Sequence, residues 1–105
     1  MMPSDRRKIL HKKLEAALAG VKVWFQPPSN MSMTYPAVIY HMEGSNNTHA
    51  DNSTYTKDVR YSVVVMDTNP DSTLWSSIMD AIPRSSLDNV MNVEGLYHWN
   101  ITLYD

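Results

Sequence analysis

The chain of 105 residues has no cysteine and only three glycines. The lack of cysteine excludes disulfide scaffolds and the zinc finger and zinc ribbon classes. The three glycines are too far apart for a glycine-rich phosphate loop or a Gly-x-Ser-x-Gly nucleophile elbow. No apolar run approaches the roughly 20 residues that span a bilayer, and no apolar core of a signal peptide follows the basic N-terminus. We therefore expect a protein made and kept in a cytoplasm, with no membrane partner.

A large net charge is also missing. The formal charge is −2, with 43% hydrophobic and 19% charged residues, which indicates one globular domain over 1–105 and argues against a dedicated nucleic-acid binder. The charges are uneven, however: residues 1–22 sum to +4 and residues 23–105 to −6. This asymmetry suits head-to-tail association or an acidic neighbour, although a solvated helix face is the more common explanation of such a charge pattern.

No motif in the chain carries chemistry. Asp67-x-Asn69-x-Asp71 begins like a calcium loop, but Pro70 interrupts it, and Ile78 stands where the final glutamate belongs. The four histidines show no metal-ligand spacing. We expect no catalytic residues, no metal and no cofactor, and hence a protein that is not an enzyme.

Hydrophobic periodicity predicts seven elements. The predicted helices span 5–19 and 72–82, with a cap from the Asn69–Ser72 turn, and the predicted strands span 21–26, 37–42, 59–66, 87–93 and 96–104. Glu94-Gly95 fits a two-residue hairpin turn. The polar stretch 44–56 is either a long loop or a β-ribbon that turns at 51–53, and its length favours a functional role.

The order α-β-β-β-α-β-β predicts the α+β class, with a largely antiparallel sheet of about five strands and two helices on one face. Several strands are apolar on both sides, yet two helices cover only one face of such a sheet. Either the sheet curls on itself or a neighbouring subunit covers the rest, so we expect oligomerisation. In the last strand Tyr97, Trp99, Ile101 and Leu103 should face the core.

The order of several short motifs, taken together over nearly the whole chain, resembles the small tail terminator proteins of long-tailed bacteriophages, also called tail completion or head–tail connector proteins. These motifs are Pro27-Pro28, Met33-x-Tyr35-Pro36 before Ile39-Tyr40, Ala50-Asp51-Asn52 with Tyr55, Arg60-Tyr61, Asp67 with Pro70-Asp71-Ser72, and the closing segment Tyr97–Tyr104.

The resemblance implies an α+β virion protein that assembles into a ring, usually a hexamer, at the tail–neck junction after synthesis in the host bacterial cytoplasm. Such a ring caps the tail tube, ends its polymerisation and leaves a channel through which DNA passes without sequence-specific binding. Its partners would be further copies of itself, the tail tube protein and neck proteins. Another neck or connector subunit is an alternative reading, and a small nucleic-acid-binding module is an alternative of a different class.

Candidate assembly contacts follow from charge, from the polar stretch and from two tryptophans. One is out of phase with the core residues of its strand, and the other lies at the edge of the apolar stripe of its helix. The candidate contacts are Arg6, Arg7, Lys12, Lys13, Trp24, Asn47, His49, Asp51, Asn52, Tyr55 and Trp75.

Overall fold

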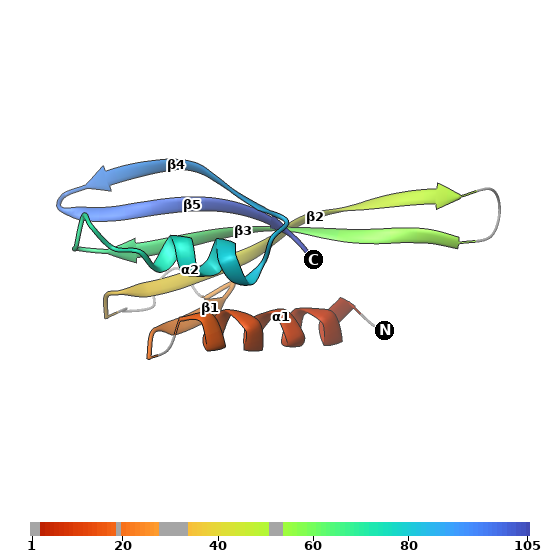
Figure 1. Cartoon of the computed structure of the whole chain (residues 1–105), viewed down its shortest axis with the longest axis horizontal. Coiled ribbons are helices and arrows are strands. Elements are labelled where there is room, and N and C mark those ends of the chain that lie inside the picture. Colours follow the sequence, from red (N-terminus) through yellow and green to blue (C-terminus); the bar gives the residue numbers. More distant parts are fainter. Residues whose placement is uncertain (1–2, 19, 28–33, 51–53) are drawn as a thin grey trace.

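The structure, a computed structural model, describes residues 3–18, 20–27, 34–50 and 54–105, with the backbone alone for 3–6, 45–50 and 54–58. It has the predicted element order (Figure 1): α1 (Pro3–Ala17), β1 (Lys22–Phe25), β2 (Ala37–Ala50), β3 (Thr54–Asp67), α2 (Leu74–Ala81), β4 (Ser85–Val93) and β5 (Leu96–Tyr104). The α+β class is therefore confirmed.

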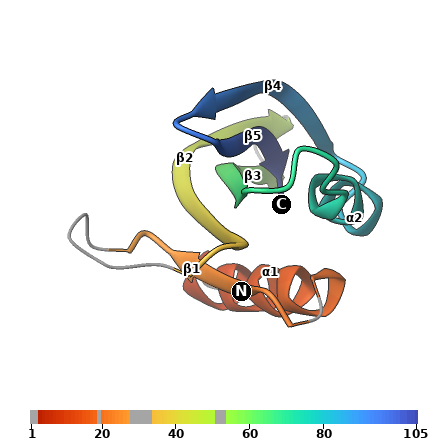
Figure 2. The same cartoon turned by 90° about the vertical axis from the view of Figure 1, so that its left-hand side faces the viewer.

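The strands form one five-stranded sheet in the order β1-β2-β3-β5-β4. Only β1 and β2 are parallel, and the other three pairings in the described sheet are antiparallel. The sheet is strongly curved, with both helices on its concave side, so that α1 and β1 lie opposite β4 (Figure 2).

The core fills the space between the concave face and the helices. Leu10, Leu14 and Leu18 recur at four-residue spacing and bury one stripe of α1, as predicted for an amphipathic helix. Ile78 and Ile82 from the α2 region join the same cluster. The strands complete it with Val23, Val38, Tyr40, Val59, Tyr61, Val63, Val65, Trp99, Ile101 and Leu103.

The last hairpin agrees with its prediction. Glu94 and Gly95 have φ values of 52° and 85°, the sign that a two-residue turn matching the strand twist requires at both positions. The Asn92 Oδ1 accepts a hydrogen bond from the Gly95 N–H at 3.0 Å. In β5, Trp99, Ile101 and Leu103 are buried and Tyr97 packs against them, so the predicted phase of this strand is confirmed.

The first strand is shorter than predicted (Lys22–Phe25), and β4 begins two residues earlier than predicted, at Ser85. Three larger differences concern the two helices and the segment 44–56. The first helix begins and ends two residues earlier than predicted, and Gly20, with φ of 85°, lies beyond its end. The second helix is shorter than 72–82, and the predicted side-chain cap is wrong. Thr73 holds the N-cap position without a side-chain hydrogen bond, and its carbonyl accepts from the Ser76 and Ser77 N–H groups at 3.0 and 3.2 Å.

The third difference concerns 44–56, where the β-ribbon alternative is the correct one. Strand β2 continues through Ala50 and β3 begins at Thr54, so each strand is 14 residues long. The predicted turn at 51–53 lies outside the described residues. The paired strands extend well beyond the rest of the fold (Figure 1), which gives the molecule its dimensions of 52 × 23 × 23 Å.

Candidate assembly surfaces

The projecting ribbon consists of the paired backbone segments 45–50 and 54–58. The register runs from Gly44 opposite Arg60 to Ala50 opposite Thr54, with His49 directly opposite Tyr55. Strand β1 pairs with β2 only as far as Tyr40, and β5 pairs with β3 only from Arg60 onward. Val59 still exchanges two backbone hydrogen bonds with Asp105, at 3.1 and 3.0 Å. Within the described part of the chain, the ribbon strands therefore pair with each other alone.

A β-bulge marks the point where the ribbon leaves the body. The register shifts between Met42 and Gly44, so Glu43 is the extra residue. A bulge bends the strand that carries it and increases the local twist. A Cβ added at Gly44 would meet the Arg60 Nη2 at 3.7 Å, an ordinary contact, so the junction does not require a glycine.

An isolated two-stranded hairpin is marginally stable in water. The ribbon sequence offers little apolar surface to offset the entropy of ordering it, because most of its residues are Ser, Asn, Thr, His, Lys or Asp. Of the predicted contacts, Asn47, His49 and Tyr55 occupy ribbon positions, whereas Asp51 and Asn52 lie outside the described residues.

The basic residues of α1 divide into two groups. The Arg7 guanidinium lies 4.5 Å from the centre of the Phe25 ring, so this cation faces the sheet of its own chain. The exposed Lys13 Nζ lies 3.7 Å from Oδ1 of the partly buried Asp105, in an ion pair. Lys8 and Lys12 are exposed to solvent, whereas the Arg6 side chain lies outside the described residues.

A buried tyrosine fastens α1 to the sheet. The Tyr40 hydroxyl lies 2.7 Å from His11 Nδ1, and His11 Nε2 lies 3.8 Å from Glu15 Oε1. Burial raises the pKa of Tyr40 above its ordinary value of 10.0, while a hydrogen bond and the positive charge of Arg7 act in the opposite direction. This cluster explains why Arg7 is less available for a partner than the sequence suggested.

The two candidate tryptophans have different surroundings. Trp75 packs partly buried against the core cluster, so its removal would disturb the subunit as well as any contact. Trp24 points to the convex face, where Ile39 and then Val64 are its cross-strand neighbours. These three apolar residues are half-buried. They alternate with buried residues such as Val23 and Val63, so they lie on the other face of the sheet from the core.

Sequence reasoning missed a third surface, on the edge strand β4. Val90, Met91 and Val93 are 49%, 48% and 51% exposed. All three lie in β4, the last strand of the sheet. Their apolar character predicted a strand, but the sequence does not reveal which strand lies at an edge.

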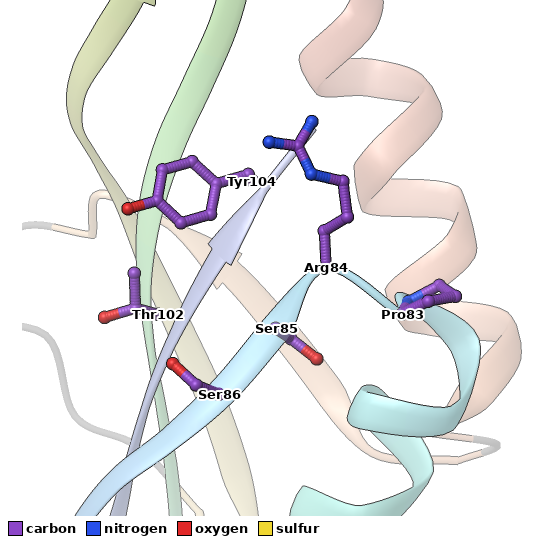
Figure 3. Close-up of a pocket in the computed structure, with 6 residues that line it drawn as sticks. All are labelled: Pro83, Arg84, Ser85, Ser86, Thr102 and Tyr104. Atoms are coloured by element: carbon purple, nitrogen blue, oxygen red, sulfur yellow. The ribbon is translucent and has the colours of Figure 1, made fainter.

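An open depression of about 310 Å³ lies where α2 leads into β4 (Figure 3), lined by Pro83, Arg84, Ser85, Ser86, Thr102 and Tyr104. Most of its polar groups have intrachain partners. Thr102 Oγ1 donates to Asp88 Oδ2 at 2.5 Å, Ser85 Oγ donates to the Ile82 carbonyl at 2.6 Å, and the Arg84 guanidinium lies 5.5 Å from the Tyr104 ring centre. This arrangement joins β4 to β5.

No three histidine or acidic side chains in the described ranges gather as metal ligands. Among those same residues, no helix is both long and apolar enough to cross a membrane. No protein-family model matches the chain, and no curated protein matches its sequence.

Proposed function

We propose that this protein is a structural ring subunit that caps a phage tail tube, ends its polymerisation and joins the tail to the neck. The likeness of its ordered motifs to tail terminators motivates the proposal. A non-catalytic role also fits a chain whose notable features are surfaces rather than a reactive site.

The observation that carries the proposal is the ribbon. In a monomer, a polar two-stranded extension without flanking strands buries too little apolar surface to offset the conformational entropy lost when its backbone is ordered. It becomes stable when a second protein supplies a surface or an additional strand along it. We therefore assign the ribbon to contact with a neighbouring subunit or with the tube.

The convex face and the edge strand support the same reading. The row formed by Trp24, Ile39 and Val64 lies beneath neither helix, and β4 exposes three more apolar side chains. Apolar residues at a free sheet edge promote association with another chain. We place the assembled ring at the tail–neck junction of the virion, with DNA passing through its channel without sequence readout.

The test is co-assembly with a cognate tail tube protein. Purified tube protein is allowed to polymerise with increasing amounts of this protein, and tube lengths are measured by negative-stain electron microscopy. We expect shorter tubes, each with a ring-shaped density at one end. Unchanged tube lengths and bare ends would contradict the proposal.

Two controls distinguish the alternatives. Binding to neck proteins with no effect on tube length would indicate a connector subunit instead. Binding to short DNA at physiological salt, with no binding to either phage protein, would indicate a nucleic-acid-binding module, whose affinity should fall steeply as salt is raised.

A further inference from the structure

Two opposite sides of the subunit carry opposite charge. Residues 1–25, which include α1 and β1, hold six basic and two acidic side chains, whereas 85–95, which comprise β4 and its hairpin turn, hold two acidic and no basic side chains. These segments form opposite ends of the curved sheet, with α1 and β1 on one side and β4 on the other (Figure 2). The charge asymmetry of the sequence is therefore a polarity of the folded subunit.

The acidic side presents an apolar strip between two carboxylates, which we call the β4 strip (Asp88–Glu94). The side chains from Asp88 to Glu94 are all exposed. Asp88 is the extra residue of a bulge at one end of the strip, and Glu94 lies in the hairpin turn at the other. Between them Val90, Met91 and Val93 are each about half exposed. Met91 and Val93 lie on one face of the strand and Val90 on the other. An edge strand of this composition is an association site unless something covers it.

The basic side presents the complementary arrangement on the outer face of α1. Ile9 is 42% exposed, and Lys8, Lys12 and Lys13 are exposed around it. Residues three and four positions apart are neighbours on a helix surface, so Ile9 lies beside both Lys12 and Lys13. Next to this face lies an open hollow of about 280 Å³ that Lys8 and Lys12 line with Arg7, His11 and Glu15.

We propose that the β4 strip of one subunit packs on the outer face of α1 of the next copy. Met91 and Val93, which lie on the same face of the strand, would cover Ile9 and the neighbouring hollow, while Glu94 at the end of the strip would face Lys12. Both the apolar side chains and the charge at the end of the strip match, which a like-for-like contact between two β4 strips would not achieve because their carboxylates repel.

This pairing is head-to-tail, since the two surfaces differ and lie on opposite sides. Repetition of such a contact produces a ring if the rotation closes and a filament if it does not. The inference rests on the proposed function only in assuming that the chain self-associates, and it assigns the surfaces through which it does so.

Cysteine cross-linking tests the pairing cleanly, because the chain has no natural cysteine. The double variant Ile9→Cys/Val93→Cys carries one thiol on each proposed surface, at exposed positions where substitution changes folding little. With a short bis-maleimide we expect a ladder of covalent dimers, trimers and larger species. Each single variant, Ile9→Cys or Val93→Cys, should remain uncross-linked.

A ladder that is absent while the wild-type mass shows an oligomer would overturn the pairing and leave the ring proposal standing. Efficient dimers from Val93→Cys alone would overturn it as well, because they would indicate a two-fold contact between β4 strips. If the wild-type chain stays monomeric even in the presence of tube protein, the proposal of a ring is itself contradicted.

Charge reversal provides an independent test of which groups meet. Lys12→Glu and Glu94→Lys should each raise the concentration needed for half-assembly about tenfold, which corresponds to about 1.4 kcal/mol. The combined variant Lys12→Glu/Glu94→Lys should recover most of this loss, since every contact regains opposite charges. Asp80→Lys, at an exposed α2 position, makes the same charge change outside the strip and should leave assembly unchanged. Equal losses for Glu94→Lys and Asp80→Lys, without recovery in the combined variant, would overturn the assignment.

Discussion

The same two strands behave differently in the body and in the ribbon. Near the helices β2 and β3 are flanked by β1 and β5, and residues such as Tyr40, Val63 and Val65 are fully buried. Beyond the bulge at Glu43 the strands have only each other, and their sequence turns polar. Backbone pairing is equally regular in both halves, so the difference lies in side-chain burial. Regular strand geometry alone does not make a pair of strands stable. We therefore expect the stability of the ribbon to depend on contacts with another protein.

The largest effect should come from the body. Trp99 is 4% exposed in the core cluster, and truncating a buried tryptophan costs about 3–5 kcal/mol of a typical total of about 5–15. Trp99→Ala should therefore greatly lower the urea midpoint or unfold the chain. A variant that keeps the wild-type midpoint would show that the core does not carry the stability assigned to it.

The other two tryptophans sharpen the comparison between core and surface. Single substitutions commonly lower the free energy of unfolding by about 0.5–3 kcal/mol. The loss for Trp75→Ala should lie near the top of this range, since Trp75 packs against the core. The loss for Trp24→Ala should lie near the bottom of the same range, and this variant should mainly weaken self-association. Urea melts and native mass measured on both variants check this order, and the reverse order would place the subunit interface at α2.

The attachment of α1 to the sheet should weaken at alkaline pH. Because burial raises the pKa of Tyr40 in the folded chain above 10.0, its proton is lost first from the unfolded state. Its contribution to stability is present below about pH 10 and declines as pH rises above that value.

Tyr40→Phe isolates this contribution. It should cost about 1 kcal/mol at neutral pH, because the contact with His11 is lost. Its free energy of unfolding, measured by urea titration, should also decline less steeply than that of wild type as the pH rises above about 10. Parallel declines in the two proteins would show that Tyr40 does not ionise on unfolding.

The smallest effect should come from the junction. Since a Cβ at Gly44 meets only an ordinary contact with Arg60, and its φ is not in the left-handed region, Gly44→Ala should change stability by less than about 1 kcal/mol. Thermal unfolding of the variant checks this. A large loss would mean that the bulge needs a glycine.

Sequence patterns predicted the body well and its surfaces poorly. Leu10, Leu14 and Leu18 repeat at helical spacing, Trp99, Ile101 and Leu103 alternate, and Glu94-Gly95 forms the turn its residues favour, so each element follows from local physics. The ribbon strands lack apolar alternation, which left the loop alternative open. The contact of Arg7 with Phe25 and the edge position of β4 depend on tertiary arrangement, which no local pattern encodes.

The most direct test of the account is the native mass of the wild-type chain and of a ribbon-shortened variant in which a short Gly-Ser linker replaces residues 45–58, each measured alone and with tail tube protein. We predict that the shortened chain keeps the urea midpoint of the body but stays monomeric under conditions in which the wild type forms a discrete closed oligomer. A shortened chain that still assembles and caps tubes like the wild type would contradict the claim that the ribbon is an assembly element.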